Sequence, residues 1–201
     1  MFLALFVLDL SAEQNRQQTG EHMPLRLTKG KTIVPVLPPL GARVLNVPWI
    51  KQEQTQWCWA ACAQMGLRYY GNLIVRQCDL ANWLFGQSGC CQAPSSSLCN
   101  RPCQVADVCR VYNAFGLRCY SSSGTIGFGA IQLEIDQGRP VGPAFVWKGG
   151  GGHAVIVRGY YDDGKVHVND PWYGQGAITY ADLVAAYGLG SWFWTFTDLR
   201  R

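Results

Sequence analysis

The sequence predicts an α+β fold, because apolar residues at helical spacing in one stretch of the chain give way to β-branched and aromatic runs in the next. A four-glycine turn and an Asp-Asp-Gly turn separate the later runs, as expected for antiparallel strands. The expected helices span 57–70, 78–85, 104–115 and 126–137. The expected strands span 141–147, 153–161, 165–170 and 191–197, with a short helix over 182–187. Two such halves leave a cleft between them.

The first expected helix carries apolar residues on one face, among them Trp59 and Cys62. Thr55 suits its N-cap and Gly71 suits its end. With Thr55 as the cap, Cys58 takes the third helical position. The helix dipole favours a thiolate there, and the N–H groups of the first turn have no helical partners.

Glycine and proline bound the later elements. Gly138 and Pro140 end the fourth helix. The loop 86–101 is so rich in Gly, Ser, Cys and Pro that we expect only disulfides to hold it rigid. In the second half, the turn at 162–164 joins two strands as a hairpin, and Pro171 ends the second of them.

Composition divides the chain into three parts. Residues 1–12 start with an apolar run and form a candidate signal segment, although no basic residues precede the run. Residues 13–45 are polar and then proline-rich, and we expect a leader or a propeptide that occupies the cleft. Residues 46–201 are the expected folded domain. Stable membrane insertion is not expected, since no run approaches the ~20 apolar residues that a spanning helix needs.

Nine cysteines lie between positions 58 and 119. In an oxidising compartment, eight can form four disulfides and leave one free thiol, so a secreted or periplasmic location is expected. The alternative is a zinc site built from Cys90, Cys91, Cys99 and Cys103. These spacings do not form paired CxxC motifs. The net charge of +4 is spread thinly without a Lys/Arg block, so a nucleic-acid partner is not expected.

A thiol nucleophile needs a base, and the chain holds three histidines. His22 lies in the leader, and His167 lies within an expected strand, where an ordinary structural role suits it. His153 follows four glycines, so its ring is expected to face open space. The base needs an acceptor that orients it. Hairpin pairing brings the end of the following strand beside His153, which favours Asp170 and leaves Asn169, on the opposite face, as the alternative.

Three glutamines, Gln52, Gln54 and Gln56, precede the candidate nucleophile. A side-chain amide in this place can donate a hydrogen bond to an oxyanion. The residues alone do not decide which glutamine has this role.

The run 52–61 resembles the nucleophile segment of papain-like cysteine peptidases, whose signature is a Cys-Trp pair with a glutamine six residues upstream. The segment 152–160 resembles their histidine strand, and 168–172 resembles the segment that supplies the third member. The Trp-Cys-Trp-Ala-Ala form and the His-to-Asp interval of seventeen are most similar to avirulence-effector peptidases of plant-pathogenic bacteria. Bacteriocin-processing peptidases are similar in the last two segments. The resemblance covers residues 46–196.

The resemblance implies a papain-like fold and a cysteine peptidase that acts on protein or peptide substrates without a metal or organic cofactor. It implies a triad of Cys58, His153 and Asp170, with Gln52 as an oxyanion donor. Papain itself has asparagine as the third member. The eight further cysteines are not part of the effector pattern and favour an extracellular role.

Two alternatives stay open. The same thiol–imidazole pair also catalyses deamidation, transamidation and isopeptide cleavage. A disulfide-rich secreted binding protein with an inert cleft is the other alternative, and it requires Cys58 to be disulfide-bonded. Tryptophans that line either a hydrophobic subsite or the core are Trp57, Trp59, Trp147, Trp172 and Trp192.

Overall fold

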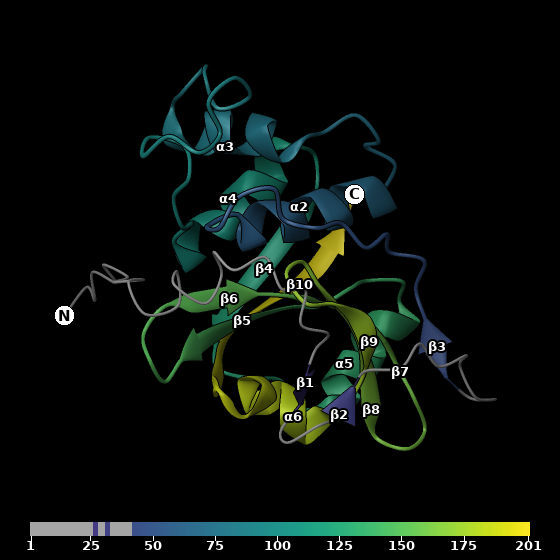
Figure 1. Cartoon of the computed structure of the whole chain (residues 1–201). Coiled ribbons are helices and arrows are strands. Elements are labelled where there is room, and N and C mark those ends of the chain that lie inside the picture. Colours follow the sequence, from purple (N-terminus) through teal and green to yellow (C-terminus); the bar gives the residue numbers. More distant parts are fainter. Residues whose placement is uncertain (1–25, 28–30, 33–41) are drawn as a thin grey trace.

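The computed structural model describes residues 26–27, 31–32 and 42–201 (Figure 1). The candidate signal segment 1–12, His22 and most of the expected leader lie outside the described residues. Within that leader, β1 (Arg26–Leu27) and β2 (Lys31–Thr32) form an antiparallel pair. The strand β3 (Arg43–Val44) pairs with a strand of the domain.

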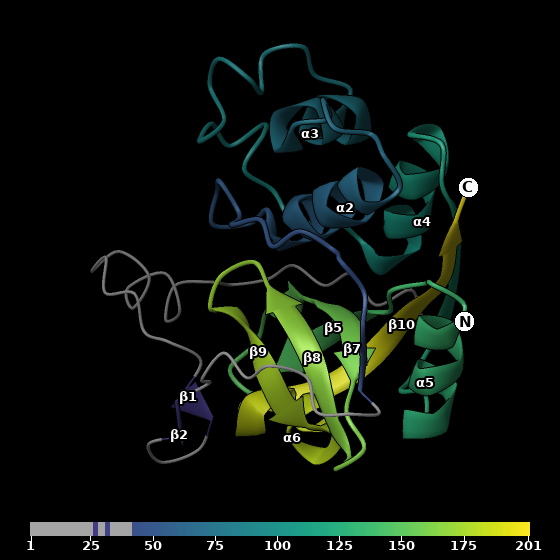
Figure 2. The same ribbon diagram turned by 90° about the vertical axis from the view of Figure 1, so that its right-hand side faces the viewer.

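Three helices form one half of the molecule, which lies above the sheets in Figure 2. They are α2 (Cys58–Tyr69), α3 (Gln77–Phe85) and α4 (Val105–Ala114). A buried cluster that includes Trp57, Leu67 and Leu80 joins them. Within residues 42–201, no helix combines the length and apolar content that crossing a membrane requires.

Two four-stranded antiparallel sheets form the second half (Figure 2). The first sheet has the order β4 (Arg118–Ser123), β10 (Gly190–Arg200), β5 (Gly142–Trp147) and β6 (Gly152–Ala154). The second has the order β3, β7 (Ile156–Tyr160), β8 (Lys165–Asp170) and β9 (Gly174–Thr179). The helices α5 (Phe128–Asp136) and α6 (Tyr180–Val184) and the 3-10 helix η1 (Ala186–Gly188) share a core with these strands. The α+β prediction is confirmed, with the fourth helix in the sheet half.

The expected strand 153–161 is divided between the two sheets. Its start, β6, pairs with β5, and its continuation, β7, pairs with β8 across the hairpin at 162–164. Between them the Val155 N–H donates to the Pro143 carbonyl at 3.1 Å. One continuous segment therefore joins the sheets and brings β6 close to the end of β8.

Sequence reasoning misses β4 and β9. Half of the residues of β4 are serine, and β9 contains two glycines, so neither shows the alternating apolar pattern of a half-buried strand. Both lie at the edge of a sheet. The short helix expected over 182–187 begins earlier, because the Thr179 side chain caps it by accepting from the Asp182 N–H.

Three disulfides are present, Cys78–Cys91, Cys90–Cys99 and Cys109–Cys119. The free cysteines are Cys58, Cys62 and Cys103. The expectation of four disulfides and one free thiol is therefore wrong. Cys62 is buried on α2 and lies in the core, where its thiol packs like a small apolar side chain. Three of the four cysteines of the zinc alternative are disulfide-bonded, so that site does not form.

A polar network around Arg158 of β7 ties the second sheet together. Its guanidinium donates at 2.8 Å to Asn169 Oδ1 and to the Leu45 carbonyl. It also lies 2.9 Å from His167 Nε2, which must accept, so Nδ1 carries the proton and donates to the Tyr161 hydroxyl at 2.7 Å. Burial, and then the Arg158 charge, lower the pKa of His167 from 6.5 to about 4. The structural role expected for His167 fits these contacts.

The low pKa of His167 predicts a loss of stability in acid. Its folded-state pKa of about 4 lies below its ordinary value of 6.5, so the unfolded chain binds the proton first as the pH falls. The neutral ring's contribution is complete above the ordinary pKa and is lost between the two values, by about 2 kcal/mol after allowance for solvent screening. Urea unfolding of wild type and His167→Gln across this range measures it. A stability difference that does not change with pH would contradict the assignment.

Candidate active site

Cys58 is the first residue of α2, and Trp57 is the N-cap. The prediction that Thr55 caps this helix is wrong. Thr55 Oγ1 accepts a hydrogen bond from Asn100 Nδ2 at 2.9 Å, and no side chain of the described residues caps the helix. Cys58 thus lies two positions nearer the end than expected. It still lies at the positive end of the dipole, beside N–H groups without helical partners.

His153 enters the site from β6, where it pairs with Phe145 of β5. The glycines before it have a structural reason. Gly150 and Gly151 have φ angles of 88° and 91°, which favour glycine. A Cβ at Gly152 would lie only 2.9 Å from the Phe145 carbonyl oxygen. The turn therefore needs glycine to bring β6 against β5 and to present the imidazole.

Asp170 ends β8 with a fully buried carboxylate. Its Oδ1 lies 2.9 Å from His153 Nε2 and accepts from the N–H groups of Trp172 and Tyr173 at 2.8 and 3.0 Å. Its Oδ2 accepts from the Tyr187 hydroxyl at 3.0 Å. All the contacts place the carboxylate against the His153 ring.

Asn169 points to the other face of β8, as strand alternation requires. Its Nδ2 donates to the Val47 carbonyl at 3.1 Å, and its Oδ1 accepts from Arg158. The structure thus pairs His153 with Asp170 and not with the alternative. Sequence reasoning misses Tyr187, because an aromatic residue near the end of a short helix carries no motif.

Aromatic rings enclose the His153 imidazole. Trp147 stacks on it with centroids 5.7 Å apart, and Tyr173 meets it edge-on at 6.1 Å. Burial is the largest influence on the pKa of His153 and lowers it. The charge and hydrogen bond of Asp170, with a side-chain hydrogen bond and charge interaction from Cys58, outweigh burial and raise the pKa from 6.5 to about 10. Because Asp170 lies at Nε2, Nδ1 is the ring nitrogen left for the thiol.

Gln52 is buried, and it lines a cavity that Cys58 and His153 also line. Its Nε2 donates to the carbonyls of Gln54 and Thr55 at 2.8 and 3.1 Å, and its backbone N–H donates to the Pro171 carbonyl at 3.0 Å. Its Oε1 has no hydrogen-bond partner among the described residues. Gln56 also lines the cavity, whereas Gln54 is not among the described residues that do so.

A cavity of about 420 Å³ opens beside Cys58 and His153, between the helical half and the first sheet. None of the described residues that line it is Asp, Glu, Lys or Arg. Its aromatic lining consists of Trp59, Phe145, Trp147, Trp172, Tyr173, Phe193, Trp194 and Phe196. Three of the five tryptophans named from the sequence therefore line the cavity. Trp57 and Trp192 lie in the core instead.

Two other free thiols lie near the nucleophile. Cys103 lines the cavity, and its thiol donates to the Gln104 carbonyl at 3.2 Å. Cys62 lies one turn further along α2 and faces the core. Burial raises the pKa of both thiols well above the ordinary value. Only Cys58 combines a free thiol, a helix N-terminus and an imidazole partner.

A thiol at the start of a helix that faces an imidazole carried by an antiparallel sheet defines the papain-like class of cysteine peptidases. Residues 44–192 match the profile of the Peptidase C39-like family, and the chain belongs to this family. It is therefore a cysteine peptidase, as the sequence predicts. A search of curated proteins finds no significant match.

Three solved structures are similar to this chain. A double-glycine motif protease from an AMS/PCAT transporter, in complex with its leader peptide, is 20% identical with a TM-score of 0.51, over 79% of this chain and 95% of that chain. Interpain A of Prevotella intermedia is 14% identical with a TM-score of 0.46, over 82% and 98%. The Pseudomonas avirulence protein AvrPphB is 8% identical with a TM-score of 0.38, over 78% and 98%. The first of these likenesses supports the papain-like fold.

Removal of the Asp170 charge should lower the pKa of His153. In Asp170→Asn, burial would no longer be opposed by a carboxylate, so the pKa should fall from about 10 toward or below 6.5. NMR titration of the ring protons measures this change. His167 is an internal control, because its pKa of about 4 should stay the same. An unchanged His153 pKa would mean that a different group holds its proton.

Proposed function

We propose that the chain hydrolyses peptide bonds with Cys58 as the nucleophile, His153 as the proton-transfer group and Asp170 as its orienting partner. The contact chain from the thiol through the imidazole to a fully buried carboxylate, at the wall of a cavity, carries this proposal. Membership of the Peptidase C39-like family supports the same chemistry.

Acylation starts from a Cys58 thiolate paired with a His153 imidazolium. The thiolate attacks the scissile carbonyl carbon, and the carbonyl oxygen takes the negative charge. The imidazolium then gives its proton to the leaving amine as the C–N bond breaks, which leaves an acyl-enzyme and a neutral ring. Asp170 stabilises the ring while it is charged and keeps its orientation when it is neutral.

Deacylation reverses the roles. The neutral His153 takes a proton from water, the hydroxide attacks the thioester, and the Cys58 thiolate leaves as the acid product forms. In both steps the oxyanion accepts from the Cys58 backbone N–H and from Gln52 Nε2. The hydrogen bond from Gln52 Nε2 to the Thr55 carbonyl is the longer of its two carbonyl contacts. The oxyanion replaces the Thr55 carbonyl as the acceptor of this hydrogen bond.

The cavity wall favours neutral, apolar substrate side chains. Its described lining has many aromatic rings and no charged side chain of the Asp, Glu, Lys or Arg type. Burial of a charged side chain there would cost free energy without a partner to offset it. Proteins and peptides with an apolar residue near the scissile bond are therefore the proposed substrates.

Three disulfides support a secreted or periplasmic location, because such bonds persist in oxidising compartments. We further propose that residues 46–201 act as the peptidase domain and that residues 13–45 are a leader. The free Cys58 thiol favours the enzyme over the inert binding protein, which requires a disulfide on that sulfur.

Activity should depend on Cys58 and, to a lesser degree, on Gln52. Cys58→Ala should abolish cleavage because no nucleophile remains, and Gln52→Ala should lower kcat by about 10² to 10³ through loss of one oxyanion donor. Gln54→Ala is the matched control and should keep wild-type activity. Cleavage of a mixture-based peptide library, followed by mass spectrometry, measures all four proteins.

Full activity in Cys58→Ala would overturn the proposed mechanism. Release of ammonia from glutamine-containing peptides without chain cleavage would instead assign the same thiol to deamidation. Equal losses in Gln52→Ala and Gln54→Ala would show that the loop as a whole, and not one amide donor, supports the oxyanion.

A chain that starts at Val47 should be more active than the full chain if residues 13–45 occupy the cleft. The two proteins are compared by their initial rates on the same peptide library and by their rates of Cys58 alkylation with iodoacetamide. Equal rates in both assays would mean that the leader does not inhibit.

A further inference from the structure

The segment that leads into the nucleophile is bound by a loop from the helical half, which we define as the disulfide loop, residues 86–103. Asn100 of this loop contacts two successive residues of that segment. Its Oδ1 accepts from the Gln56 N–H at 3.0 Å, and its Nδ2 donates to Thr55 Oγ1 at 2.9 Å. The amide therefore bridges the chain two and three residues before Cys58.

The two tryptophans that flank Cys58 are bound by the same loop. Trp57 Nε1 donates to the Cys99 carbonyl at 2.8 Å, and Trp59 Nε1 donates to the Arg101 carbonyl at 3.1 Å. Three consecutive residues of the loop, 99 to 101, thus make four hydrogen bonds to residues 55–59. The loop is therefore bonded to residues on both sides of Cys58 in the sequence.

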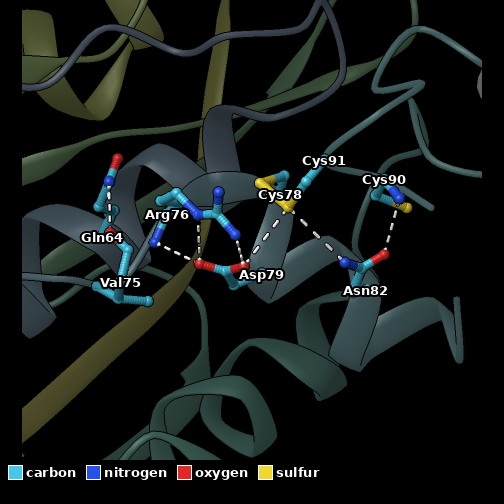
Figure 3. Close-up of polar contacts among 8 residues, drawn as sticks. All are labelled: Gln64, Val75, Arg76, Cys78, Asp79, Asn82, Cys90 and Cys91. Atoms are coloured by element: carbon cyan, nitrogen blue, oxygen red, sulfur yellow. Dashed lines mark hydrogen bonds and ion pairs between the residues drawn. A yellow bond between two sulfur atoms is a disulfide. The ribbon is translucent and has the colours of Figure 1, made fainter. Parts of the chain in front are cut away.

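The disulfide loop is itself fixed to the helical half. Cys90–Cys99 closes it with both cysteines buried, and Cys78–Cys91 joins it to α3. A hydrogen bond also joins the loop to α3, because Asn82 Oδ1 accepts from the Cys90 N–H at 2.8 Å (Figure 3). The carbonyls and the amide that hold the nucleophile segment therefore project from a cross-linked frame.

We propose that Asn100 is a positioning residue for the nucleophile, acting through Gln56 and Thr55, and that the disulfide loop is the frame that supports it. This inference rests on the proposed function of Cys58. Asn100 is not part of the thiol, imidazole and carboxylate group, but the rate of the thiol chemistry depends on it.

We call the four hydrogen bonds from residues 99–101 to residues 55–59 the clamp. The clamp is needed because α2 begins without a cap. No side chain of the described residues caps this end, so no capping hydrogen bond opposes fraying of the first turn. Cys58 is the first residue of that turn, and any fraying moves its sulfur relative to His153. A displacement of about 1 Å can cost roughly 100-fold in rate, whereas the binding of remote substrate groups is little affected.

This positioning role imposes opposite redox requirements on Cys58 and on the Cys90–Cys99 pair. Cys58 must be a free thiol to react, and Cys90–Cys99 must stay oxidised to keep the clamp closed. Exposure of the two disulfide residues is only 0% and 3%. A reductant in solution therefore reaches the half-buried Cys58 sulfur more readily than the buried Cys90–Cys99 disulfide.

The test compares Asn100→Ala, Asn100→Asp and wild type, with Asn113→Ala on the exposed surface of α4 as the matched control. The main readout is the rate of Cys58 alkylation by iodoacetamide against pH, with the modified cysteine identified by mass spectrometry. Peptide cleavage gives kcat and KM, and thermal unfolding sets an assay temperature well below every midpoint.

Asn100→Ala should slow Cys58 alkylation near neutral pH by roughly 10- to 100-fold and lower kcat with little change in KM. Asn100→Asp should recover most of the rate, because a carboxylate oxygen still accepts from Gln56 and the Thr55 hydroxyl can turn to donate. Asn113→Ala should match wild type. Unchanged alkylation in Asn100→Ala, or an equal loss in Asn113→Ala, would overturn the proposal.

The two proposals fail in different ways. If wild type cleaves no peptide but Cys58 is alkylated rapidly and Asn100→Ala slows this reaction, the clamp stands and the peptidase mechanism falls. If peptides are cleaved through Cys58 and Asn100→Ala has wild-type rates, the clamp falls and the mechanism stands. A loss in Asn100→Ala that Asn100→Asp does not recover would also count against positioning by the amide.

Discussion

The buried carboxylate of Asp170 is the constraint on which the rest of the site depends. An unpaired charge in this position would cost several kcal/mol, so its donors must stay in place. They come from β6 through His153, from the turn after β8 through two N–H groups, and from η1 through Tyr187. Tyr187 has a φ of 61° and its predecessor a φ of 42°. This backbone costs about 1 to 3 kcal/mol per residue, which the surrounding contacts must offset.

The two described histidines show how position decides the chemistry of one residue type. Both are largely buried, and burial lowers the pKa of each. His167 lies beside the Arg158 cation and is held neutral, which suits a structural acceptor. His153 lies beside the Asp170 anion and is held protonated, which suits a partner for a thiolate. Their contributions to stability depend on pH in opposite directions, since that of His153 is present below pH 6.5 and is lost as the pH rises through about 10.

The sequence predicts most of the helices and the site residues that local patterns mark, and it fails where distant contacts decide. Alternation along β8 shows that Asp170 and Asn169 face opposite ways, and the hairpin brings one of them to His153. Thr55 has the chemistry of a cap, but a hydrogen bond from Asn100, distant in sequence, holds it elsewhere. Tyr187 reaches Asp170 through a turn with positive φ angles that no local pattern marks. The number of disulfides also depends on the fold, which leaves Cys62 and Cys103 as free thiols in addition to Cys58.

The position of the thiol relative to the carboxylate is set by the segment 45–57, which crosses from the sheet half to the helical half. At the sheet end, the Leu45 N–H donates to the Arg158 carbonyl at 2.7 Å. Further along, Trp49 Nε1 donates to the Asp170 carbonyl at 2.7 Å, and the Gln52 N–H donates to the Pro171 carbonyl at 3.0 Å. The segment is thus bonded to the strand that carries the carboxylate before it reaches the disulfide loop and the start of α2. Both halves of the site are therefore tied to this one segment. A shift of β8 would move the segment that leads into Cys58 by the same displacement. The distances between the thiol, the ring and the carboxylate are thereby preserved.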